Sequence, residues 1–171
     1  MDPEISETEE SASIMHRVGA FLRDDGKMID SEQLLVRSFE IYLRILGEEH
    51  PNTLRSMGNL ALTYMDQGRT GKAAALQEEV LEKRRRILGD EHPKTLRSMS
   101  NLTLTYRDQG RTAEAAALQE EVLEKCRRIL GAEHPDTLMS MSNLARTYRD
   151  QGRTAEAAAL EEEVLEKRRR K

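Results

Sequence analysis

The sequence repeats itself with a period of 42 residues. Residues 48–89 and 90–131 differ at only eight of their 42 positions, and a third copy fills residues 132–171 and stops where Ile, Leu and Gly would follow. A glycine recurs at the same point of every period: Gly26, Gly68, Gly110 and Gly152. The first of these glycines extends the pattern back to a diverged copy at residues 6–47. Repeats of about 20–50 residues indicate a solenoid, in which each unit packs on its neighbours.

This period predicts four structural units. Residues 1–47 contain an acidic N-terminal segment and the diverged copy, which we expect to cap the array with a polar outer face. Residues 48–89, 90–131 and 132–171 are three regular repeats, of which the last is truncated at its C-terminal end.

Each regular copy predicts two antiparallel helices joined by a short loop. The first helix begins near His50 and Pro51, because proline is tolerated at the first helical position, and it ends at Gly68. The second begins near Thr70, which is expected to be its N-cap, and ends at Gly89. Apolar residues of the first helix recur at helical spacing and form its buried stripe: Leu54, Met57, Ala61 and Tyr64.

The order of small, aromatic and glycine residues resembles the tetratricopeptide repeat. Ala61, Tyr64, Gly68 and Ala73 stand at that family's usual offsets, and the resemblance makes Ala61 and Ala73 the points where paired helices approach closely. The longer period is similar to the kinesin light chain type, and also to the tandem arrays of fungal NACHT and NB-ARC signalling proteins. The resemblance implies an all-α fold, a right-handed α-solenoid of four helix-turn-helix repeats.

Composition excludes several classes of protein. The net charge is −4, so no global basic field points to nucleic acid. The sequence has no run of 18 or more apolar residues, the length that a membrane-spanning helix needs. The acidic N-terminus lacks the pattern of a signal peptide. We therefore expect a cytoplasmic protein with no nucleic-acid and no membrane partner.

The sequence contains no constellation of catalytic or cofactor-binding residues. His50, His92 and His134 occur one per repeat, which does not place two metal ligands on one helix face, and we expect them to start helices. Cys126 replaces the arginine found at Arg84, so we expect a surface thiol without a special role. No glycine-rich phosphate loop occurs. The sequence predicts a non-enzyme without metal or cofactor.

Two basic runs, residues 83–86 and 167–171, are expected to be solvated helix ends. Each run closes a helix that carries glutamates earlier, and Glu79 with Lys83 forms a favourable i, i+4 pair. Binding to nucleic acid would also need aromatic side chains nearby on which bases could stack, and none are present.

The candidate binding residues lie on the first helices, opposite the buried stripe. In the tetratricopeptide family these helices line a concave groove, and asparagine there offers both donors and acceptors to an extended peptide. The alternative is that this asparagine caps or braces the neighbouring helix. The full lysine-asparagine set of the chaperone-binding subset is not reproduced. The predicted groove residues are Arg55, Asn59, Leu62, Arg97, Asn101, Leu104, Asn143 and Arg146.

These observations favour a protein–protein interaction module that binds a peptide or helical segment of a partner in the groove. The alternative is a structural, self-assembling array, or a fragment of a larger signalling or motor-adaptor protein. The final helix should expose apolar residues that an additional repeat would cover, which suggests end-to-end self-association through this C-terminal helix. The apolar residues concerned are Ala157, Leu160, Val164 and Leu165.

Overall fold

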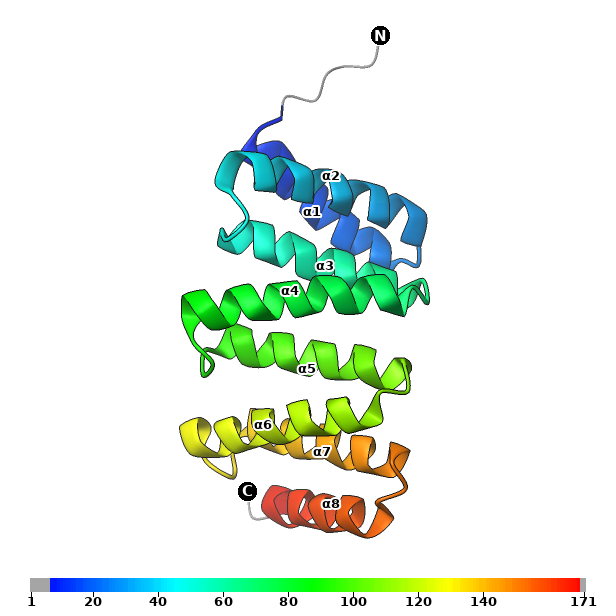
Figure 1. Cartoon of the computed structure of the whole chain (residues 1–171), viewed down its shortest axis with the longest axis vertical. Coiled ribbons are helices and arrows are strands. Elements are labelled where there is room, and N and C mark those ends of the chain that lie inside the picture. Colours follow the sequence, from blue (N-terminus) through cyan, green and yellow to red (C-terminus); the bar gives the residue numbers. More distant parts are fainter. Residues whose placement is uncertain (1–6, 170–171) are drawn as a thin grey trace. The chain divides into compact units, whose positions relative to one another are not determined.

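The computed structural model describes residues 7–169, which form eight helices and no strand (Figure 1). Residues 1–6 of the expected acidic segment, and Arg170 and Lys171 of the second basic run, lie outside the described residues. The helices are α1 (Glu9–Asp24), α2 (Met28–Leu46), α3 (Pro51–Asp66), α4 (Thr70–Leu88), α5 (Pro93–Asp108), α6 (Thr112–Leu130), α7 (Pro135–Asp150) and α8 (Thr154–Arg169).

The all-α helix-turn-helix fold is confirmed. Helices α3, α5 and α7 begin 42 residues apart, and the same interval separates α4, α6 and α8. We call α1, α3, α5 and α7 the first helices and the others the second helices. None of the described helices is long and apolar enough to cross a membrane.

The chain forms two compact units. Unit 1 comprises Met1–Lys83 and unit 2 comprises Arg84–Lys171, so α4 contributes to both. Ala12, Met15, Ile41 and Tyr42 form one core cluster of unit 1, between α1 and α2. The core of unit 2 joins α6, α7 and α8: Ala116, Leu123, Leu138, Met141, Leu144, Ala145, Tyr148, Ala157 and Val164.

The predicted first-helix boundaries are confirmed by cap geometry. The imidazole Nδ1 of His50 accepts a hydrogen bond from the backbone N–H of Asn52 at 3.2 Å, and His92 and His134 do the same in their repeats. Gly68 has φ +73, a left-handed conformation that glycine adopts without strain, and it ends the turn after α3. The expected N-cap at Thr70 is wrong, because α4 begins at Thr70 itself. In α6, which begins at the equivalent Thr112, the N-cap residue is Arg111 and makes no side-chain cap bond.

The small residues at the close helix contact are fully buried, as the repeat pattern predicts. Ala61 and Ala73 have no exposed surface. In the diverged copy Gly19 occupies the position of Ala61, and a Cβ atom there would lie 2.8 Å from Leu35 Cγ and 3.3 Å from the Ser31 carbonyl oxygen. A side chain at Gly19 would therefore force Leu35 to move, which favours glycine at this contact between α1 and α2.

Two expectations about burial are wrong. Cys126 is buried rather than on the surface, and burial, with a contribution from Asp136, raises the pKa of its thiol. Arg84 is buried as well, so the first basic run is not wholly solvated. Arg84 is covered by α5 and Cys126 by α7, in each case the first helix of the next repeat. Position on a helix face alone does not reveal such a neighbour.

The two ends of the described chain also differ from expectation. Ala157 and Val164 of α8 are buried in the core with α7 and Leu160 is partly buried, so of the four residues named only Leu165 is exposed. The diverged copy does not present a polar outer face, because α1 exposes a stripe of apolar side chains: Ile14, Val18 and Phe21.

Candidate functional site

The predicted groove residues lie on one face of the first helices, which we call the first-helix face. In unit 1, α3 carries exposed Arg55 and half-buried Asn59 and Leu62, spaced i, i+4 and i+7. In unit 2 the predicted residues lie on the neighbouring helices α5 and α7: exposed Arg97, Leu104 and Arg146 and half-buried Asn101 and Asn143. Each unit therefore presents its own part of the predicted set.

Polar pairs 43 residues apart tie neighbouring first helices together. In unit 2, Arg107 Nε lies 2.6 Å from Asp150 Oδ2, which joins the C-terminal ends of α5 and α7. In unit 1 the equivalent ion pair joins α1 and α3, with Arg23 Nε 3.7 Å from Asp66 Oδ2. These contacts hold the spacing of the helices that carry the candidate residues.

Asn59 braces α1 through a buried histidine. Its Nδ2 lies 3.0 Å from Nε2 of His16, which is only 6% exposed. An amide nitrogen can only donate, so Nε2 accepts and the ring proton is on Nδ1, which has no partner among the described residues. Burial, with a contribution from Arg55, lowers the pKa of His16 to about 4, so the imidazole is neutral at pH 7.

This histidine predicts a specific loss of stability in acid. Between pH 6.5 and pH 4, unfolded His16 binds a proton and the folded residue does not, so stability falls as pH falls. The slope is at most about 1.4 kcal/mol per pH unit. Replacing His16 with serine, the residue at the equivalent Ser100 and Ser142, removes the group that titrates.

Urea denaturation at about pH 7 and about pH 5 measures this effect. The wild type should lose about 2 kcal/mol more than His16→Ser over that interval. Equal pH dependence in the two proteins would contradict the burial of a neutral imidazole.

The guanidinium groups of the first-helix face differ from the cations of the second helices in their ion pairing. Arg55, Arg97 and Arg146 form no ion pair with any other residue between 7 and 169. On the second helices, by contrast, basic side chains form ion pairs with glutamates in successive repeats. Examples are Lys83 with Glu48 at 2.8 Å, Arg85 with Glu121 at 3.0 Å and Arg127 with Glu163 at 3.1 Å. The first-helix face therefore offers unpaired donors to a ligand.

A repeated arginine–tyrosine stack was not predicted from the sequence. The guanidinium of Arg153 lies 3.7 Å from the ring centre of Tyr148, and Arg111 and Arg69 stack in the same way on Tyr106 and Tyr64. The two residues are five positions apart and separated by the left-handed glycine, which folds the arginine back over the ring. This constant spacing of tyrosine and arginine in every regular repeat is the sequence feature from which the stack could have been predicted. The stack stabilises the turn between paired helices.

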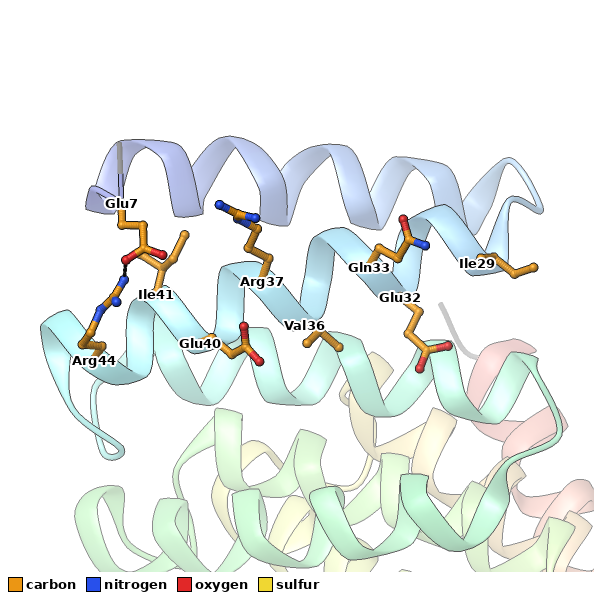
Figure 2. Close-up of a pocket in the computed structure, with 9 residues that line it drawn as sticks. All are labelled: Glu7, Ile29, Glu32, Gln33, Val36, Arg37, Glu40, Ile41 and Arg44. Carbon is orange, nitrogen blue, oxygen red and sulfur yellow. Dashed lines mark ion pairs between the residues drawn. The ribbon is translucent and has the colours of Figure 1, made fainter. Parts of the chain in front are cut away.

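A depression of about 700 Å³ lies on the outer surface of α2 (Figure 2). Figure 2 shows an ion pair between two of the residues that line this depression, Arg44 and Glu7. Partial burial raises the pKa of Glu32, but hydrogen bonds from Gln67 and Arg69 outweigh this and hold the pKa below its ordinary value. Glu32 is therefore an ionised structural partner, and its surroundings do not make it a general acid.

A second depression, of about 730 Å³, lies between α6, α7 and α8. Its floor is apolar, with Leu123, Leu144 and Leu160, and its rim is charged. Tyr148 donates to Glu120 at 2.8 Å, and its pKa is raised by burial and by that carboxylate. Among the described residues, no group of three His, Cys, Asp or Glu could hold a metal ion. The residues that line this depression offer a ligand hydrogen bonds, charges and apolar contacts.

Comparisons with known proteins agree with this architecture. The sequence model for the tetratricopeptide repeat matches residues 10–85, 58–124 and 104–170. A Podosopora anserina protein described as a kinesin light chain with nearly identical TPR-like repeats is similar in structure, with a TM-score of 0.86 and 31% identity, covering 95% of this chain and 77% of that one. A point variant of the same protein has a TM-score of 0.88 and 32% identity, covering 96% and 77%.

More distant structures share the fold alone. BtubC (BKLC) of P. vanneervenii has a TM-score of 0.82 at 18% identity and covers 92% of this chain and 63% of its own. The apo form of RapI has a TM-score of 0.80 at 16% identity and covers 96% and 58%. No curated protein sequence matches this chain significantly.

Proposed function

Because the chain belongs to the tetratricopeptide repeat family, we propose that it is a non-catalytic protein–protein interaction module that binds a peptide or helical segment of a partner at its first-helix face. Tetratricopeptide repeats typically mediate protein–protein interactions and typically have no catalytic activity. The observation that carries the proposal is the set of exposed arginines and half-buried asparagines on the neighbouring helices α5 and α7, where the arginines have no ion-pair partner among the described residues.

The chemistry of this face suits an extended segment. Asn101 and Asn143 can each donate to and accept from a peptide backbone, whose N–H and C=O groups need partners. Arg97 and Arg146 present planar guanidinium groups that bind carboxylates with two parallel hydrogen bonds. Leu104 is exposed on α5, seven residues after Arg97, and adds an apolar contact.

A four-residue variant of unit 2 tests the proposal. Replacing Arg97, Asn101, Asn143 and Arg146 with alanine should weaken capture of the partner by about tenfold or more, equivalent to about 1.4 kcal/mol. The measurement is affinity purification from cell extract with the full chain, followed by titration of the captured protein. Asn59 is left unchanged, because its removal would leave buried His16 without its hydrogen bond.

The matched control lies on the second helices. Glu82→Ala with Glu124→Ala changes two exposed residues at one repeat position and should leave binding unchanged. Substitutions of exposed residues usually change stability by no more than about 0.5 kcal/mol, so we expect this control variant to stay folded. Loss of binding in this control, with retention in the four-residue variant, would place the binding surface on the second helices.

A second candidate function is self-association as a structural array. It is favoured by Leu165 of α8, which is 55% exposed although its equivalents in earlier second helices, Leu81 and Leu123, are buried. Leu160→Glu and Val164→Glu are unsuitable probes of this contact, because both side chains pack against the core of unit 2. Leu165→Glu changes the exposed residue instead.

A further inference from the structure

The outer face of α1 carries an apolar stripe, which we call the head stripe. Ile14, Val18 and Phe21 are spaced i, i+4 and i+7, so they lie on one side of the helix. They are 53%, 42% and 67% exposed. Contiguous exposed apolar side chains mark a surface that another element covers.

In later repeats the same positions are covered by a second helix. Ile14 corresponds to Ser56 of α3 and to Ser140 of α7, and both serines are buried. Ser56 lies 3.5 Å from Ser38 of α2, and Ser140 Oγ accepts from Nε2 of Gln119 of α6 at 2.9 Å. The fold therefore places the second helix of a preceding repeat on this side of a first helix.

The outer face of α8 is the complementary half of that contact. Ala158, Leu165 and Arg168 are exposed, and we call them the tail face. Their equivalents in α6 are all buried, and the first two belong to the core cluster that α6 forms with α7: Ala116, Leu123 and Cys126. The tail face therefore has the side-chain pattern of a second helix that packs on a following first helix.

Arg84 shows what an arginine at the position of Arg168 does when that face is covered. Arg84 is buried, and its Nη1 donates to Ser98 Oγ at 2.7 Å and to the Lys94 carbonyl oxygen at 3.3 Å, both on α5. In α1 the residue equivalent to Lys94 is Glu10. An arginine in this position therefore reaches the first turn of the helix that covers it.

We propose that two copies of this chain associate head to tail, with the tail face of α8 in one copy packed on the head stripe of α1 in the other. This inference rests on the second candidate function above, self-association, and names the surface that α8 binds. In the contact seen between α6 and α7, the C-terminal end of the second helix lies near the N-terminal end of the first helix. The proposed pairing therefore brings Lys167, Arg168 and Arg169 of α8 to Glu9 and Glu10 of α1.

The charges of both faces are compatible with this pairing. The basic end of α8 meets the acidic first turn of α1, and opposite charges across an interface fix its register. Glu161 stands at the position of Gln119 and is ion-paired with Arg149 of its own unit, so its charge is compensated when α8 is covered. The contact is heterologous, because one copy contributes its head and the other its tail.

Single-face variants and their mixture test the pairing. The apparent mass of the wild-type chain should rise with concentration in sedimentation velocity. Leu165→Glu blocks the tail and Phe21→Glu blocks the head, so each variant alone should be monomeric. An equimolar mixture of the two should form a one-to-one dimer, because each variant keeps the face that the other needs. Both residues are exposed, and unchanged circular dichroism spectra show that the variants fold.

A charge exchange checks the register. Arg168→Glu and Glu10→Arg should each weaken association by about tenfold, and the chain carrying both changes should recover it. The parallel control is Arg37→Glu, an exposed arginine of α2 outside both faces, which should leave association unchanged.

Each other outcome contradicts the pairing in a recognisable way. A wild-type chain that stays monomeric at the highest accessible concentration overturns both self-association and the head-to-tail contact. If Phe21→Glu alone still dimerises and Leu165→Glu does not, α8 pairs with itself, so self-association stands and the head-to-tail contact is wrong. If Leu165→Glu alone still dimerises, α8 is not the interface. Partner capture at the first-helix face is measured separately and is independent of all three results.

Discussion

Met141→Ala is expected to lower the free energy of unfolding by about 2–5 kcal/mol, the range for deleting a large buried side chain from a packed core. Met141 has no exposed surface and packs in one cluster with Leu138 and Leu144. Removing its side chain leaves a cavity that these neighbours fill only in part. Guanidinium denaturation followed by far-UV circular dichroism measures the change.

The control is two residues away on the same helix. Met139 is 56% exposed, so Met139→Ala should change the free energy of unfolding by less than about 0.5 kcal/mol. The two substitutions are chemically identical and differ in the face of α7 on which they lie. Equal losses in the two variants would show that the buried and exposed faces of α7 are assigned wrongly.

Ala145→Leu is expected to destabilise the chain by about 1–3 kcal/mol, because the close helix contact has no room for a larger side chain. Ala145 is fully buried in the core of unit 2. The equivalent residue of the diverged copy is Gly19, where even a methyl group would meet Leu35 Cγ at 2.8 Å. Thermal unfolding compared with Ala117→Leu, an exposed alanine of α6, isolates this effect. Similar melting temperatures would mean that Ala145 does not mark the contact.

The helices, and the ends of the first helices in particular, could be predicted from the sequence because they depend on local chemistry. Proline at the first helical position, the histidine before it and the left-handed glycine act within a few residues, and the period repeats them. The small residues of the close contact are also visible, since Ala61 and Ala73 belong to that repeating pattern. These features needed no knowledge of which helices lie side by side.

Burial at the ends of the repeats could not be predicted, because it depends on which neighbour covers each face. The repeat pattern treats Cys126, Arg84 and Arg168 as one position, yet the first two are buried beneath the next first helix and the third is exposed. The head stripe was hidden for the same reason. Its residues have helical spacing whether or not another helix lies on them.

The candidate site shows the same limit. In the sequence, Asn59, Asn101 and Asn143 stand at one repeat position and are predicted to be equivalent groove residues. Asn59 is distinguished by His16, which stands where the later copies have glycine or serine and engages its amide at 3.0 Å. A contact between residues 43 positions apart becomes visible only once neighbouring first helices are placed together.

Site-specific photo-crosslinking measures directly whether the first-helix face contacts the partner. A photoreactive amino acid is placed at Leu104, which is exposed on α5, or at Ala117, which is exposed on α6, in otherwise identical full chains. Mass spectrometry then identifies the crosslinked peptide of the captured partner. Crosslinking at Leu104 and none at Ala117 is the result the proposal predicts; crosslinking at Ala117 with none at Leu104 would contradict it.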